Sequence, residues 1–124
     1  MTKASNNLAR QKCVPCEGGV KRIAASAAKE LATALPGWKL AVRAKRLERS
    51  YTFKNFRENM AFLNRVAEIA EAQGHNPDFS VHYNRCDFAI FTHAIDGLSK
   101  NDFILAAKID RIAAIQASGK QART

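Results

Sequence analysis

The sequence of 124 residues has few cysteines, prolines and glycines and no long apolar run, and each of these absences excludes a class of protein. It has three cysteines, three prolines and six glycines, too few for a disulfide-stabilised miniprotein or a collagen-like fibre. No apolar run approaches the roughly 20 residues that a membrane-spanning helix needs. Hydrophobic residues make up 47% of the chain and charged residues 25%, which is not the composition of a disordered polypeptide. We therefore expect one folded domain.

The chain is basic, with 20 lysines and arginines against 11 acidic residues and a net charge of +9. The basic excess lies in residues 1–22, 39–49 and 111–124, whereas residues 54–110 have a small acidic excess. A nucleic-acid-binding groove would place stacking aromatic residues among the basic ones, but most aromatic residues here have the spacing of core positions. We therefore favour a solvated basic periphery, and we expect neither a nucleic acid nor a membrane as a partner.

A C-x-x-C motif, Cys13-Val14-Pro15-Cys16, lies near the N-terminus. A structural zinc site needs four ligands, and outside this pair only Cys86 and three histidines remain. A thioredoxin-type redox pair would follow a strand, and no strand is predicted here. We therefore favour a local N-terminal motif with Gly18-Gly19, and zinc binding and redox activity remain as alternatives. The few cysteines, without a secretory apolar segment, predict a reducing, cytoplasmic compartment.

Apolar residues recur at helical spacing in three segments and alternate with polar residues in four others. The helical segments are residues 23–35, 55–73 and 100–117, and the strand segments are residues 38–42, 46–53, 79–83 and 86–91. The order α-β-β-α-β-β-α predicts an α+β fold, a two-layer sandwich in which a four-stranded antiparallel sheet has three helices on one face.

No linker rich in proline or glycine divides the chain, and no internal repeat is present. We therefore expect a single domain over residues 13–117. The polar segments at its two ends predict a flexible basic arm over residues 1–12 and a flexible tail over residues 118–124.

The last two strands are predicted to form a hairpin, whose turn determines which residues face each other. A two-residue turn at Asn84-Arg85 places Tyr83 opposite Cys86, and His82 opposite Asp87 on the other face. This register pairs apolar with apolar residues along one face. We expect His82 to be a surface partner of Asp87.

Extension of the same ladder predicts that two histidines meet at the open end of the hairpin. Asn76 falls opposite His93, so His75 and His93 should lie close together, and Pro77 keeps Asn76 extended. Histidine exchanges protons near neutral pH, so such a pair suits acid–base catalysis. Each histidine also has a purely structural explanation. His75 could interact favourably with the negative end of the helix dipole, and His93 could form a hydrogen bond with a backbone group at a strand end.

Asp102 is ambiguous at this stage. Ser99-Lys100-Asn101-Asp102 has the S-x-x-D pattern of a capping box before an apolar run, which explains the aspartate without any chemistry. His75 and His93 could also bind a metal. No further ligand stands at a recognised spacing, however, so no metal site is predicted.

Several motifs together resemble the pterin-4a-carbinolamine dehydratase family, and the resemblance extends from about residue 13 to residue 112. The motifs are Glu71-x-x-x-His75-Asn76-Pro77, Tyr83-Asn84, Thr92-His93, Gly97-Leu98 and Asn101-Asp102-Phe103, preceded by Cys13-Val14-Pro15-Cys16-Glu17-Gly18-Gly19, Pro36-Gly37-Trp38 and Tyr51-Thr52-Phe53-Lys54-Asn55-Phe56. Each motif is weak alone, but their combined spacing is specific. The resemblance implies the same α+β sandwich.

The resemblance also implies an activity. Members of the family dehydrate the 4a-hydroxytetrahydropterin that aromatic amino-acid hydroxylases release, and the quinonoid dihydropterin formed is then recycled. The reaction is an acid–base elimination in which the pterin is the substrate, and no metal or redox cofactor is required. By this resemblance His75 and His93 transfer the protons, Asp102 occupies the family's acidic position, and Glu71 supports His75 or orients the pterin.

The sequence departs from the family pattern at one position. Many members have two adjacent histidines before the proline, whereas here the second is Asn76. An amide can hydrogen-bond a pterin but does not carry protons at neutral pH. We therefore expect Asn76 and Pro77 to support substrate binding, while His75 and His93 perform the proton transfer.

The resemblance implies partners as well. Family members form dimers and tetramers, and some animal members bind a transcription factor as a dimerisation cofactor. We accordingly expect a homodimer or homotetramer, with an aromatic amino-acid hydroxylase or a transcription factor as further candidate partners. A non-catalytic partner-binding module of the coactivator type is the alternative function, and a nucleic-acid-binding α+β domain is a third, weaker hypothesis.

Overall fold

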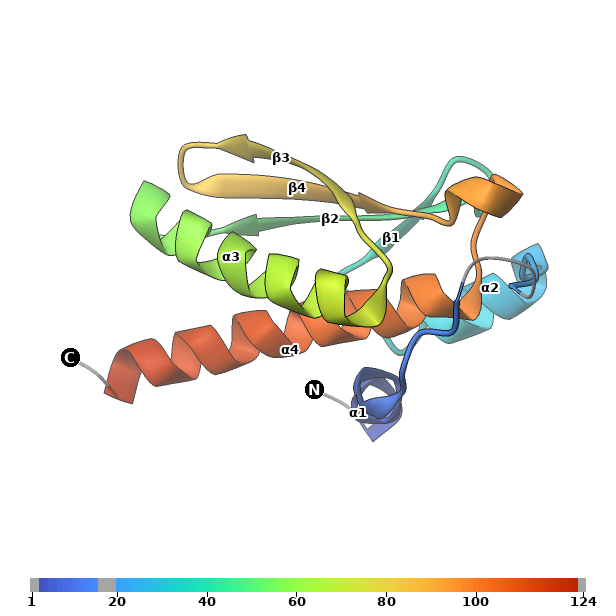
Figure 1. Ribbon diagram of the computed structural model, residues 1–124, viewed down its shortest axis with the longest axis horizontal. Helices are drawn as coiled ribbons and strands as arrows, with labels where there is room; N and C mark the ends of the chain where they lie inside the picture. Colours follow the sequence, from blue (N-terminus) through green and yellow to red (C-terminus); the bar gives the residue numbers. More distant parts are fainter. Residues whose placement is uncertain (1–2, 16–19, 123–124) are drawn as a thin grey trace.

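The computed structural model of the protein describes residues 3–15 and 20–122. Its elements, in chain order, are α1 (Lys3–Arg10), α2 (Ala25–Ala32), β1 (Lys39–Ala41), β2 (Arg46–Thr52), α3 (Phe56–Gln73), β3 (Asp78–His82), β4 (Arg85–Ile90), the 3-10 helix η1 (His93–Ile95) and α4 (Lys100–Ala122). The four strands form one antiparallel sheet in the order β1-β2-β4-β3. Figure 1 shows the α-helices on one side of the sheet, with the other face uncovered. The predicted α+β class is confirmed.

Within the described part of the chain there is one α-helix more than the sequence predicted. This helix, α1, contacts α4 and lies on the side of α4 away from the sheet (Figure 1). Its Leu8 and Ala9 are buried, and the ammonium group of Lys108 on α4 donates a hydrogen bond to the Ala9 carbonyl at 2.6 Å. The expectation of a flexible arm is therefore wrong for Lys3–Arg10, because two buried apolar side chains and a bond to α4 hold this segment.

The other boundaries differ from the predictions by a few residues. α2 is shorter than the predicted segment 23–35, and α4 continues to Ala122, so the expected flexible tail is helical up to that residue. Several alanines at the end of α4 favour continuation of the helix. The predicted helix ended earlier because the apolar periodicity is lost there. No helix in the described residues has the length and apolar character needed to cross a bilayer.

The helix α3 is bounded by two capping interactions that the sequence favours. The Asn55 side chain accepts a hydrogen bond from the Glu58 N–H at 2.9 Å, which satisfies a free donor of the first turn. At the other end Gly74 has a left-handed conformation with φ 65°, which glycine adopts at little cost. The chain therefore leaves α3 abruptly at Gly74 and turns toward β3.

The core lies between the sheet and the helices. The rings of Tyr51, Phe62 and Phe88 meet there, with centroid separations of 4.9 to 6.1 Å. Cys86 on β4 is fully buried beside them, and this burial raises the pKa of its thiol to about 11. A thiol in this state is a small apolar core residue rather than a reactive group.

The hairpin of β3 and β4 has a register two residues away from the predicted one. Its turn is Tyr83-Asn84, so His82 pairs with Arg85 and Val81 with Cys86. The amide of Asn59 on α3 donates to the carbonyls of both Tyr83 and Arg85, at 3.0 and 3.1 Å. This contact from a distant helix braces the turn.

The predicted register was wrong because a slip of two residues keeps every side chain on its face. The hydrophobic pattern therefore could not distinguish the two registers. Ser80, not His82, lies directly opposite Asp87. His82 nevertheless contacts Asp87 diagonally, with 3.4 Å between Nε2 and Oδ2, so the predicted surface pair is confirmed.

A polar cluster around Asp110 joins α4 to the sheet near the start of β1. Oδ1 of Asp110 accepts hydrogen bonds from the Trp38 indole at 3.0 Å, from the Arg49 guanidinium at 2.8 Å and from the Tyr51 hydroxyl. The Arg49 guanidinium also lies 4.4 Å from the centre of the Tyr51 ring. Burial, and then the charge of Asp110, raise the pKa of Tyr51 well above its usual value.

We expect Tyr51→Phe to lower the free energy of unfolding by about 1.5–3 kcal/mol, because a hydrogen bond to a carboxylate is lost. The raised pKa also predicts a pH effect. Above about pH 10 the unfolded chain releases the tyrosine proton while the folded protein keeps it, so stability falls as pH rises. Urea unfolding at pH 8 and pH 10.5 measures both effects. The variant should lose less stability than the wild type over this interval, and an equal loss would contradict the prediction.

Candidate functional site

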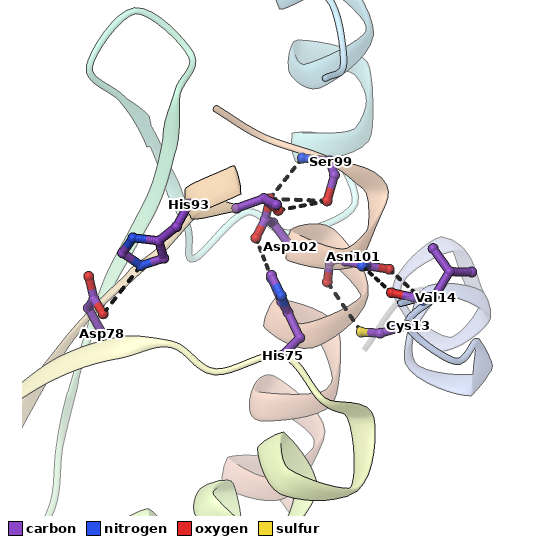
Figure 2. A network of polar contacts seen from close by, with 9 residues as sticks. Cys13, Val14, His75, Asp78, His93, Ser99, Asn101 and Asp102 are labelled. Atoms are coloured by element: carbon purple, nitrogen blue, oxygen red, sulfur yellow. Dashed lines mark hydrogen bonds and ion pairs between the residues drawn. The ribbon is translucent and has the colours of Figure 1, made fainter. Parts of the chain in front are cut away.

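His75 lies directly after α3, where the chain turns toward the sheet. Its N–H donates to the Ala70 carbonyl at 3.2 Å, which continues the cap that Gly74 begins. The imidazole is buried, with 6% of the side chain exposed, and its Nε2 lies 2.6 Å from Oδ1 of Asp102. Figure 2 shows this pair joining the segment after α3 to the start of α4.

Asp102 is fully buried, and both of its oxygens are hydrogen-bonded. Oδ2 accepts from the Ser99 N–H at 2.8 Å and from the Thr92 hydroxyl at 2.9 Å, while Oδ1 faces His75. The bond from the Ser99 N–H is the capping interaction that the sequence predicted. The cap and the histidine contact use different oxygens, so one carboxylate fulfils both roles.

His93 is the first residue of η1. It directly follows Thr92, whose hydroxyl donates a hydrogen bond to Asp102. Its side chain is 69% exposed, its ring lies 4.2 Å from that of Phe91, and its Nε2 is 3.9 Å from Oδ1 of Asp78. The structure thus brings His75 and His93 to the same corner of the molecule (Figure 2). The two rings differ in burial, and each has its own acidic neighbour.

Three other predicted site residues lie around this corner. Asn76 and Pro77 connect His75 to β3, and the asparagine is exposed while the proline is half-buried. Glu71 is exposed on the last turn of α3. These positions leave Asn76 and Glu71 accessible to a ligand.

The open face of the sheet is hollowed, and neither His75 nor His93 lines the hollow. A cavity of about 760 Å³ lies over this face, and Asp78 and Arg46 are among its lining residues. The Arg46 guanidinium also lies 4.6 Å from the centre of the Phe91 ring, which in turn contacts His93. His93 is exposed to solvent, and Asp78, whose Oδ1 lies 3.9 Å from its Nε2, is the residue that connects it to the hollow.

The N-terminal segment makes contacts with this site that the sequence did not reveal. The Cys13 N–H donates to Oε1 of Gln73 at 2.8 Å. Val14 and Asn101 exchange two hydrogen bonds, from the Val14 N–H to Oδ1 at 2.9 Å and from Nδ2 to the Val14 carbonyl at 2.8 Å. Figure 2 shows the bonds between Val14 and Asn101 beside the His75–Asp102 pair.

The rest of the C-x-x-C motif, Cys16 with Gly18 and Gly19, lies outside the described residues. Zinc binding and redox activity of the motif therefore stay as alternatives. Within residues 3–15 and 20–122, no three or more His, Cys, Asp or Glu side chains are grouped as a metal site requires.

The fold and the site define an α+β protein with a buried histidine–aspartate pair and a second histidine at the same corner. A model of the family "Pterin 4 alpha carbinolamine dehydratase" matches residues 21–112 of the chain. A protein of Rubrobacter xylanophilus and one of Nitrosomonas eutropha are each 47% identical over 107 residues, which is 86% of this chain and 99% and 93% of theirs. Both carry the provisional name pterin-4-alpha-carbinolamine dehydratase.

A crystal structure from Brucella melitensis, named "transcriptional coactivator/pterin dehydratase", has the same fold. Its TM-score is 0.72 at 32% sequence identity, and the match covers 75% of this chain and 99% of that one. The chain therefore belongs to the pterin-4a-carbinolamine dehydratase family. This finding confirms the resemblance that the motifs indicated.

Proposed function

We propose that this protein catalyses the dehydration of 4a-hydroxytetrahydropterin to quinonoid dihydropterin. The proposal is supported above all by the His75–Asp102 pair, in which a buried carboxylate lies 2.6 Å from an imidazole, within a chain of the dehydratase family. The elimination delivers one proton to the departing 4a-hydroxyl group and removes one from N5 of the ring. Two histidines at one corner suit these two transfers.

The geometry suggests a role for each imidazole. With the Nε2–H of His75 donated to Asp102, Nδ1 carries the lone pair and can accept a proton, and the carboxylate would stabilise the imidazolium formed. His93 is exposed and can exchange protons with solvent, while Asp78 lies 3.9 Å away. In our proposal, His75 takes the N5 proton and His93 protonates the leaving hydroxyl group. Asn76, Pro77 and Glu71 would contact the pterin.

A dehydration assay tests this proposal. Synthetic 4a-hydroxytetrahydropterin loses water without a catalyst, so the measured quantity is the increase in its decay rate with added protein. We expect an increase proportional to protein concentration that survives dialysis against EDTA, because our proposal needs no metal or other cofactor. A decay rate equal to that of the buffer would contradict it.

The proposal extends to a cellular role. Family membership supports recycling of the tetrahydropterin cofactor of aromatic amino-acid hydroxylases, in the cytoplasm, with such a hydroxylase as a functional partner. The alternative is a partner-binding module, which the name of the Brucella melitensis protein supports. A pulldown separates the two, because a binding module would retain a stoichiometric protein partner when both His75 and His93 are replaced.

The exposed edge of the sheet supports self-association. β3 is the last strand of the sheet, and Phe79, Val81 and Tyr83 in and beside it are 48%, 36% and 65% exposed. An apolar edge of this kind readily pairs with a second strand. We therefore include a homodimer, or a homotetramer built from it, in the proposal.

Val81→Lys should shift the protein toward a monomer, because a lysine on an edge strand opposes pairing. Light scattering coupled to size exclusion, over a range of concentrations, measures the shift. Val42→Lys is the matched control, since Val42 is 54% exposed in the turn after β1. An equal mass for Val81→Lys and the wild type would contradict pairing through β3.

A further inference from the structure

Residues 13 and 14 cross between the two elements that carry the His75–Asp102 pair. On one side the Cys13 N–H bonds the side chain of Gln73, the last residue of α3. On the other side Val14 bonds Asn101, in the first turn of α4. The Cys13 sulfur lies 3.7 Å from the Asn101 carbonyl, so the segment contacts α4 through two residues.

Both anchoring residues are close neighbours of the pair in sequence. Gln73 precedes His75 by two positions, and Asn101 directly precedes Asp102. Asn101 is 2% exposed, and its amide accepts from the backbone N–H of Val14 and donates to the backbone carbonyl of Val14. Of the common side chains only an amide presents a donor and an acceptor in this arrangement. The contact is therefore a specific link rather than surface packing.

We propose that residues 13 and 14 form a strap that acts through Gln73 and Asn101 to hold His75 against Asp102. Gln73 and Asn101 are thus positioning residues. The match to the family model begins at residue 21, so the strap precedes the matched residues, although it belongs to the N-terminal motif that resembles family members. This inference rests on the proposed function for its kinetic consequence, but the held pair is a property of the protein alone.

The kinetic consequence follows from the sensitivity of proton transfer to geometry. A displacement of about 1 Å in a catalytic group can lower a rate by about 100-fold. Loosening the strap should displace His75 without removing any group that we propose to contact the pterin. We therefore expect kcat to fall by about 10- to 100-fold, and KM to change by about twofold or less, in Gln73→Met and in Asn101→Ala.

A matched control is available at the other end of the same pair of helices. The Gln116 amide on α4 donates to the Glu58 carbonyl of α3 at 3.1 Å, so Gln116→Met removes the same kind of link far from His75. We expect its kcat to stay within about twofold of the wild type, since only the strap adjoins the site. Gln73→Met leaves the bonds between Val14 and Asn101 in place, so it also serves if Asn101→Ala folds poorly.

A spectroscopic test requires no substrate and so separates this inference from the proposed activity. A ring N–H proton in a short bond to a carboxylate resonates far downfield in the proton NMR spectrum. His75→Gln identifies the signal by its loss. We expect the signal in the wild type and in Gln116→Met, and its loss or rapid exchange with water in Asn101→Ala and Gln73→Met. Its absence from the wild type, or its persistence in both strap variants, would overturn the proposal.

Discussion

His75→Gln should lower kcat for dehydration of 4a-hydroxytetrahydropterin by about 10²–10⁴-fold, the usual contribution of a positioned acid–base group. Glutamine is chosen because its amide can still donate to Asp102, so the buried carboxylate keeps a partner and the fold is preserved. An amide does not take up a proton at neutral pH, so only the chemistry is lost. Stopped-flow measurement of substrate decay, with the uncatalysed rate subtracted, gives the effect.

The control is the same change at another histidine. His82 is exposed on β3 and contacts Ser80 and Asp87, so His82→Gln should leave kcat within about twofold of the wild type. The predicted catalytic role of His75 is wrong if both variants retain wild-type kcat. Equal losses in both variants would indicate a general loss of structure, which circular dichroism would reveal.

Asp102→Ala should have the largest effect on stability, lowering the free energy of unfolding by roughly 3–5 kcal/mol. The substitution removes the acceptor for His75, for the Thr92 hydroxyl and for the Ser99 N–H, all of which are buried. Buried donors left without a partner lose their hydration and gain nothing in return. Urea unfolding at pH 7 measures the change.

Asp87→Ala is the matched control for this prediction. Asp87 also has several partners, with the Ser50 hydroxyl at 2.6 Å and the Arg85 guanidinium at 3.1 Å, but its side chain is 36% exposed. Water can replace such partners, so the loss should be about 1 kcal/mol or less. A loss for Asp102→Ala no greater than that for Asp87→Ala would mean that the buried network contributes little to stability.

The sequence was sufficient for the elements whose pattern is local. Apolar residues at 3–4 spacing predicted α3, namely Phe56, Met60, Leu63, Val66, Ala67, Ile69 and Ala70. Leu63, Val66 and Ala70 are buried as expected, whereas Phe56 is 50% exposed and Phe62, outside the predicted stripe, is fully buried. The capping box likewise predicted the start of α4 and its bond to the Ser99 N–H. Helix α1 was missed because its only strong apolar residue is Leu8, and its stability comes from contact with α4, about a hundred residues away along the chain.

The candidate site divides in the same way. The predicted proximity of His75 and His93 was derived from a hairpin register that is wrong by two residues, yet the structure still places both histidines at one corner (Figure 2). The motifs could not show that Oδ1 of Asp102 faces His75 while Oδ2 caps the helix, because that depends on how α4 lies against the end of α3. The catalytic roles of these residues remain predictions, which the experiments above would test.

Local periodicity, capping residues and family motifs in the amino-acid sequence by themselves determined the class of fold, the strand order along the chain and the family. The tertiary structure decided the register of the hairpin and the partner of each histidine. It also decided the position of residues 13 and 14. Each of these depends on contacts between segments distant in sequence, such as Asn59 with the turn at Tyr83 or Val14 with Asn101. A pattern along one segment contains no information about such contacts, because many registers and packings satisfy it equally well.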